Sequence, residues 1–432
     1  MNTIQSRLDR LESADASPNQ APSAQPAAAQ PAAQSSQLGK ETASHQTFTE
    51  DPGAAPRLDN APIDPTYSQY FHVPGTQTLM KLGGFFKSDF IHDLRPAGNT
   101  FEFIPSTIPV PSPSGVFNSQ VSIRPTRLNL DYLIPSTQVG EVRFFVEVDF
   151  LGDVNATTPR LRHAYAQAKN LLIGQTFTNF MDPDAIPDTL DPQGPNGLVN
   201  LRNPQFRYGF SLGGGRSFYL STEEPSSDIP SSTAQFNAQP NSPSPDGTIR
   251  FRQEFQRGHV QASGLFRSIA AFEPSGVTDT VFGWGVNLAG GVRTFGRDNI
   301  IFEGTYGHGI ARYVQDTAGL GIDAQLTGSP PHFRGTPETA VEGDYQHYWT
   351  ARLRSNAVYG FVQVVNSSSE PATTYHRGEY TAGNLIWNLA GSLDLGAEFL
   401  YGWQILKSGG EGNAPRILFS AKYNFVKTGA SK

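Results

Sequence analysis

Arginine is the charged residue type whose spacing most suggests chemistry in this chain. The 432-residue sequence contains 24 arginines and only 8 lysines. A guanidinium offers a planar fork of donors that can pair with a carboxylate through two hydrogen bonds, whereas an ammonium acts as a point charge. Pairs separated by one residue occur three times: Arg160 with Arg162, Arg250 with Arg252, and Arg352 with Arg354. On an extended strand the two members of a pair lie roughly 7 Å apart on one face, so they could guide an organic anion.

An acidic group follows in the same part of the chain. It consists of four aspartates: Asp182, Asp184, Asp188 and Asp191. Oxygen ligands at this density could bind calcium, but the spacing is not that of an EF-hand, and prolines at 183, 187 and 192 interrupt the segment. Asp-Pro turns and pairing with arginines explain the group better, so we predict no metal site.

The sequence gives little support to catalysis. Its nine histidines form no HExxH motif, and neither G-x-S-x-G nor a P-loop occurs. His163 and His308 lie near hydroxyl residues, as a wall-mounted lipid hydrolase or acyltransferase would require, but packing is the simpler interpretation. Glu147 and Asp149 share one strand face without needing an acid/base role. We predict no catalytic residue, no cofactor and no nucleic-acid partner.

The elements that position these residues have a period of two. In residues 141–150, Val142, Phe144 and Val146 point one way, while Arg143 and Glu147 point the other. About sixteen such runs begin near residues 80, 120, 138, 159, 169, 204, 216, 246, 258, 278, 297, 344, 357, 378, 392 and 414. Long polar loops are expected at 96–118, 179–203, 224–245 and 314–342. Short turns alternate with these loops, which is typical of a transmembrane antiparallel β-barrel.

Composition agrees with an all-β membrane protein. A mean hydropathy of −0.38 excludes a helical membrane protein. The absence of cysteine excludes disulfides and thiolate metal sites. A soluble β-rich binding protein could show the same alternation, because periodicity does not distinguish inside from outside. Opposite charges spaced closely on the polar faces, and Trp and Tyr at the ends of the apolar faces, favour the barrel.

The two ends of the chain differ from the body. Residues 1–13 form a short heptad segment expected to be a coiled-coil helix. Residues 14–74, rich in Ala, Pro and Gln in their first part, are expected to be a flexible linker, and 75–425 the barrel. No signal peptide is apparent, so we expect a processed or engineered chain. Residues 426–432 form a tail after Tyr423 and Phe425, the expected C-terminal assembly signal.

The arginines on the polar faces are expected to line the interior. By alternation these are Arg127, Arg143, Arg160, Arg162, Arg207, Arg250, Arg252, Arg352 and Arg354. Any single one of them is better explained by pairing with an acid across the wall, whereas the set is better explained as a positive ladder facing passing anions. Residues 81–425 hold 31 acids and 26 bases, an overall charge of −5, so a preference for anions depends on where the charges lie.

Three sets of motifs make the chain resemble the DcaP-like family of outer-membrane porins. They are HVPGTQT at 72–78 with MKLGGFFK at 80–87, RLRHAY at 160–165 with LLIGQTFTNFMD at 171–182, and HYW at 347–349 with LRS at 353–355. The N-terminal heptad and linker resemble that family too.

The resemblance implies a homotrimeric sixteen-stranded porin in the bacterial outer membrane, with its N-terminal segments in the periplasm. It further implies passive uptake of small organic anions, dicarboxylates especially, and a loop after the fifth strand that narrows the lumen, here 179–203. Outer-membrane lipid and the barrel-assembly machinery are the expected partners. An outer-membrane barrel enzyme and a β-rich surface binding protein are the alternatives.

Overall fold

Sixteen long strands make up most of the folded chain. The computed structural model describes residues 70–153, 156–229, 239–241, 243–272, 278–329 and 332–425. The long strands in these ranges are β2 (Leu79–Asp93), β4 (Arg127–Thr137), β5 (Gly140–Asp149), β6 (Arg160–Ala168), β7 (Leu171–Phe177), β8 (Arg202–Gly213), β9 (Arg216–Glu223), β11 (Asp246–Phe255), β12 (Gly258–Phe272), β13 (Thr278–Arg293), β14 (Asn299–His308), β17 (Pro337–Tyr348), β18 (Leu353–Val364), β19 (Tyr375–Asn388), β20 (Leu393–Leu406) and β21 (Glu411–Asn424).

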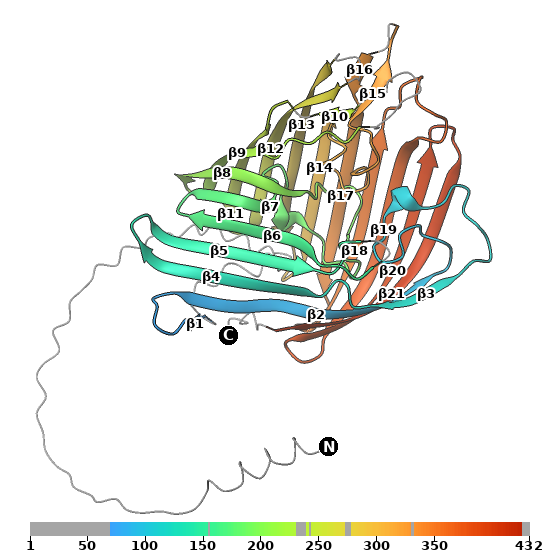
Figure 1. Ribbon diagram of the computed structural model, residues 1–432. Coiled ribbons are helices and arrows are strands. Elements are labelled where there is room, and N and C mark those ends of the chain that lie inside the picture. The colour runs from blue at the N-terminus through green and yellow to red at the C-terminus, as the bar shows by residue number, and fades with distance from the viewer. Residues whose placement is uncertain are drawn as a thin grey trace, which may run out of the picture. The chain divides into compact units, whose positions relative to one another are not determined.

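These strands form one closed antiparallel barrel (Figure 1). Each pairs with the next along the chain, and β2 closes the sheet by pairing with β21 as well as β4. Three short strands pair with barrel strands: β1 (Phe71–His72) and β3 (Asn118–Ser122) with β2, and β10 (Gln239–Asn241) with β12. A separate hairpin consists of β15 (Ala324–Thr327) and β16 (His332–Gly335). Two single 3-10 turns are η1 (Pro105–Thr107) and η2 (Pro183–Ala185). The predicted sixteen-stranded barrel is confirmed.

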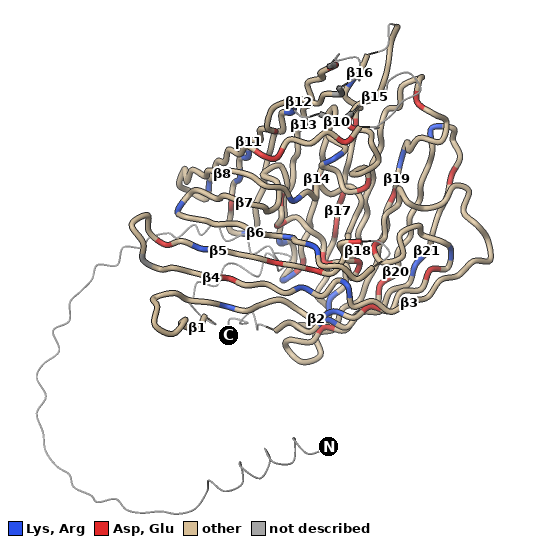
Figure 2. Tube along the Cα trace, viewed as in Figure 1, with Lys and Arg blue, Asp and Glu red and all other residues tan. Residues whose placement is uncertain are grey.

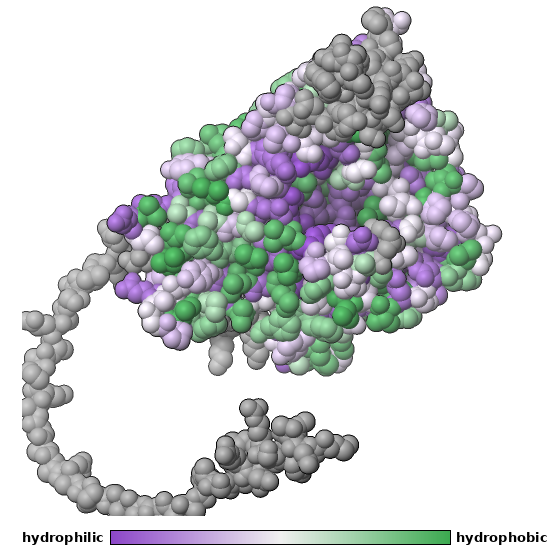
Figure 3. Space-filling model, viewed as in Figure 1, coloured by the Kyte–Doolittle hydropathy of each residue, from purple (hydrophilic) through white to green (hydrophobic). Residues whose placement is uncertain are grey.

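The two faces of the wall have the inverse of a soluble protein's polarity. In β5, Glu147 and Asp149 are buried inside, whereas Phe144 and Val146 are 42% and 41% exposed on the outside. Across the barrel the buried side chains include many carboxylates and guanidiniums, and the exposed ones many Phe, Leu and Val. Hydrophilic side chains gather in the hollow, and hydrophobic ones cover much of the near outer wall (Figure 3). An apolar outer face fits lipid, where the closed barrel satisfies every backbone hydrogen bond of the sheet.

The two ends of the barrel also differ. Tight turns at 138–139, 169–170, 214–215 and 256–257 lie at one end, together with the start of β2 and the end of β21. The longer connections 94–117 and 178–201, which the structure describes in full, start from the other end. No helix among the residues that the structure describes is long and apolar enough to cross a membrane.

Several predicted boundaries need correction. The loop expected at 314–342 ends at 336, because Glu338 and Glu342 are inward-facing members of β17 and not loop residues. Paired structure begins before the predicted boundary at 75, since Phe71 and His72 pair with Met80 and Leu79. The predicted coiled coil (1–13), the linker up to residue 69 and the tail (426–432) lie outside the described residues.

Candidate functional site

The connection between β7 and β8, residues 178–201, lies inside the barrel; we call it the inner loop. Ser263 Oγ donates to the Phe180 carbonyl over 2.7 Å, and Gln261 Nε2 donates to the Met181 carbonyl over 2.9 Å. Both donors are buried residues on the inner face of β12. The inner loop therefore rests on the wall from within, at the predicted position after the fifth barrel strand.

Carboxylates of the wall hold the middle and the end of the inner loop. Glu398 on β20 accepts from the backbone N–H groups of Leu190 and Asp191, each over 2.8 Å. Glu303 on β14 accepts from the backbone N–H of Val199 over 2.7 Å. Together with the contacts to β12, these hydrogen bonds spread the loop over the wall from β12 to β20.

A glycine, Gly197, allows the inner loop to approach this wall closely. A Cβ at Gly197 would overlap the backbone of Val341 on β17, so any larger residue would displace the loop. Beneath it lies Glu342, which is paired in register with Glu303 on the neighbouring strand. Both Glu342 carboxylate oxygens are buried and have no hydrogen-bond partner among the described residues. The inner loop thus covers an acidic wall.

The four aspartates predicted for this loop occupy two regions of it. Asp182 pairs with Arg252 over 3.1 Å and with His259 Nε2 over 2.8 Å, and Asp184 also pairs with Arg252. Asp188 pairs with Arg354 Nε over 2.6 Å. These aspartates thus lie against wall cations and do not form one cluster.

Asp191 differs because its contacts are backbone amides. Its carboxylate accepts from the N–H groups of Phe103 and Gly194, each over 3.0 Å. Burial, with the neighbouring Glu398 carboxylate, raises its pKa well above the usual range. For Asp182 burial also raises the pKa, but the charges of His259 and Arg252 outweigh it and leave the pKa well below its usual range. Asp191 is therefore held by backbone amides, whereas the charge of Asp182 is compensated by wall cations.

Asp182, Asp184 and His259 are close enough to offer three ligand atoms to a metal ion. The guanidinium of Arg252, however, already contacts both carboxylates. A cation would have to displace this arginine and also bind beside its charge. The arrangement therefore fits an ion-pair network better than a metal site.

Most of the predicted interior arginines on strands have acidic partners. Arg143 pairs with Asp131 over 2.8 Å, and Arg354 contacts Asp394 as well as Asp188. Such cross-wall pairing is the alternative that the sequence offered for each arginine singly. Basic and acidic positions both occur along many of the barrel strands (Figure 2).

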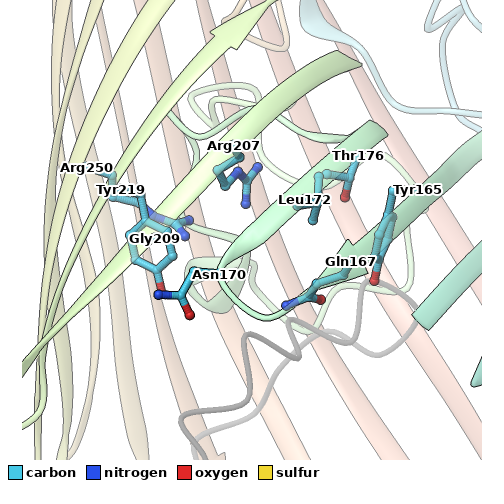
Figure 4. A pocket seen from close by; sticks show the side chains of 9 residues that line it. All are labelled: Tyr165, Gln167, Asn170, Leu172, Thr176, Arg207, Gly209, Tyr219 and Arg250. Carbon is cyan, nitrogen blue, oxygen red and sulfur yellow. The ribbon is translucent and has the colours of Figure 1, made fainter. Parts of the chain in front are cut away.

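Arg207 and Arg250 line a small cavity on the inner wall. Both guanidiniums project inward beside Tyr165, Tyr219 and Gln167 (Figure 4). Arg250 stacks on Tyr219 with 4.0 Å between the guanidinium carbon and the ring centroid. Arg207 donates from Nε to Gln205 over 3.0 Å. Their N–H groups therefore lie at the inner surface, in contact with aromatic and amide groups.

Arg352 is a correction to the predicted set. It was expected on the inner face of a strand, but it lies exposed in the turn between β17 and β18, which spans residues 349–352. Alternation through Trp349 and Leu353 suggested a continuous strand. The chain reverses direction at these positions, so strand parity does not apply to Arg352.

Four arginines lie at one level of the β4–β8 wall, and we call them the arginine belt: Arg127, Arg160, Arg162 and Arg202. Register places Arg127 level with Asp149, which pairs in turn with Arg160. Arg162 donates to Glu147 over 2.9 Å and to Asp149 over 2.7 Å. Arg160 also contacts Glu102 of the 94–117 loop over 3.6 Å. The belt holds four positive charges against three carboxylates.

Arg202 was missed by the sequence reasoning. It begins β8 at a position whose parity, shared with Pro204 and Phe206, predicts an outward side chain. The structure instead stacks it on Phe177, a residue only 3% exposed, with 4.3 Å between the guanidinium carbon and the ring centroid. At the end of a strand, alternation predicts the direction of a side chain least well, because the chain leaves the sheet there.

A closed barrel with an apolar exterior, a charged interior and an inner loop resting on its wall defines an outer-membrane channel of the porin type. The comparisons identify it further. Residues 66–425 match the family described as DcaP outer membrane protein. The chain belongs to that family, which places it in the bacterial outer membrane.

Solved structures show the same fold. The outer membrane channel DcaP of Acinetobacter baumannii is 24% identical, with a TM-score of 0.72 over 82% of this chain and 99% of that one. OmpT, an outer membrane protein of Vibrio cholerae, is 11% identical, with a TM-score of 0.52 over 83% of this chain and 100% of that one. An anion-selective porin from Comamonas acidovorans is 10% identical, with a TM-score of 0.51 over 81% of this chain and 100% of that one. No curated protein sequence matches the chain.

Proposed function

We propose that this channel passes small hydrophilic solutes by passive diffusion and prefers organic anions, dicarboxylates above all. The observation that carries the proposal is the positive excess of the arginine belt on the β4–β8 wall. The charged aspartates of that loop are engaged by Arg252, His259 and Arg354. Fixed charge beside a narrow passage governs selectivity more than the net charge of the chain does. No step of this function requires catalysis.

Liposome swelling tests the preference. Vesicles containing the channel should swell faster in succinate than in a neutral sugar of similar size, because the belt raises the local concentration of anions. The effect should persist at moderate salt, since charges in a confined interior are screened less than in bulk water. Vesicles without protein are the control, and equal rates for succinate and sugar would refute the preference.

We further propose that the channel is a homotrimer whose N-terminal segments lie in the periplasm. The family resemblance supports this assembly. A heptad segment of thirteen residues is too short to hold three chains together by itself, so the barrel walls should supply most of the contact.

Deleting residues 1–38 should therefore leave a trimer that still conducts. Size analysis in mild detergent, with the full chain as reference, checks the assembly, and planar bilayers check conduction. A deletion variant that runs only as a monomer would assign the assembly to the N-terminal segment instead.

A further inference from the structure

Arg202 differs from the rest of the belt in its partners. Within the described part of the chain its guanidinium makes no hydrogen bond and no ion pair, and its Nε is buried without a partner. A guanidinium held in a protein interior without a counter-charge is costly, because desolvation is not repaid. The Phe177 ring lies against a face of the guanidinium, so its N–H groups point along the edge and not into the ring.

Arg127 has a similar shortage of partners. Among the described residues its only ion pair is a long one, 3.8 Å from Glu147, and its Nε is also buried without a hydrogen-bond partner. Phe85 lies under this guanidinium, with 5.4 Å between the guanidinium carbon and the ring centroid. Arg127 and Arg202 therefore share one arrangement: an aromatic ring against the flat face and an edge that lacks acceptors.

The neighbours of Arg202 are mainly other arginines. Arg162, Arg127 and Arg160 lie within electrostatic reach of it, as does the carboxylate of Glu147. Glu147 is itself engaged by Arg162 over 2.9 Å. His163 Nε2, also buried and without a partner, lies in the same region, where its ring packs on Phe177 at 4.9 Å.

We propose that Arg202 and Arg127 form a carboxylate-binding site at the belt, in which each guanidinium edge receives one carboxylate of a dicarboxylate. The aromatic rings fix the guanidinium planes in advance, so little side-chain freedom is lost on binding. Arg162 and Arg160 remain bound to the wall carboxylates and contribute positive potential only. This inference rests on the proposed anion preference and gives it a binding residue that lies outside the strand pattern.

Block of chloride current by succinate tests the site. Single channels in planar bilayers with potassium chloride would be titrated with succinate to find the concentration that halves the current. Arg202→Gln should raise that concentration about tenfold or more, as expected for loss of a charged hydrogen-bonded contact. Arg202→Lys, which keeps the charge but loses the fork, should give a smaller rise. Arg352→Gln, which removes an exposed turn arginine, is the matched control and should change nothing.

Arg127→Gln separates the two halves of the site. It should weaken block by succinate more than block by acetate, because only the dicarboxylate uses both guanidiniums. Equal losses for the two anions would remove Arg127 from the site.

The remaining outcomes distinguish this inference from the proposed function. If the wild-type channel prefers anions but Arg202→Gln and Arg352→Gln are blocked alike, the site is refuted and the proposed function stands. If the wild-type channel prefers cations, both are refuted. If Arg202→Gln does not assemble, Arg202→Lys decides by the same comparison with Arg352→Gln.

Discussion

Excising residues 183–195 from the inner loop should raise single-channel conductance severalfold. Conductance should rise because the excised segment occupies the interior, where the backbone N–H groups of Leu190 and Asp191 hold it to Glu398 of the wall. Single-channel recording in planar bilayers, with the full chain as reference, measures the change.

A point variant checks that the loop's seat on the wall matters. Gly197→Ala places a Cβ against the Val341 backbone and should displace the loop from the wall. Conductance should therefore rise, but less than after the excision. Gly304→Ala on β14 is the matched control, because a Cβ there meets nothing within 4 Å. Unchanged conductance after excision would show that the inner loop does not limit the passage.

Arg162→Gln should be the most destabilising substitution in the arginine belt. The guanidinium is buried and holds both Glu147 and Asp149, which are 0% and 1% exposed. Removing one partner of a buried ion pair leaves an uncompensated charge and costs about 3–5 kcal/mol. We expect a loss of about 3 kcal/mol in unfolding free energy, at the low end of this range, because Asp149 keeps Arg160 as a partner.

Urea unfolding followed by heat-modifiable gel migration would measure this loss. Arg352→Gln is again the control and should stay within about 0.5 kcal/mol of wild type. The double variant Glu147→Gln with Arg162→Gln should recover part of the loss, since it removes the stranded charge. Equal stability of Arg162→Gln and Arg352→Gln would mean that lumen water solvates these carboxylates fully.

The barrel was predictable because lipid and interior impose opposite demands on alternate residues. Residues 141–150 match β5 within one residue, with the inward and outward sides as expected. The start of β17 was not predictable, since Glu338 and Glu342 look like loop residues until the loops inside the barrel cover them. Their environment is created by segments distant in sequence, which alternation does not report.

The interior site was predictable only as a set of arginines. Which arginine has a partner depends on cross-strand register and on where the loops rest. Arg252 has three carboxylate neighbours, whereas Arg202 has no partner within hydrogen-bonding reach among the described residues. Arg202 lies at a strand end where parity predicts the opposite face, so its inward position follows from packing on Phe177.

The zero-current potential of the wild-type channel in a potassium chloride gradient tests the central claim most directly. The claim is that a local excess of arginine sets the selectivity of a chain whose formal net charge is −7. We predict a potential of the sign that chloride permeation produces, and a shift towards zero when Arg127 and Arg202 are both replaced by Gln. A potential of the opposite sign in the wild type, or no shift in the double variant, would contradict the claim.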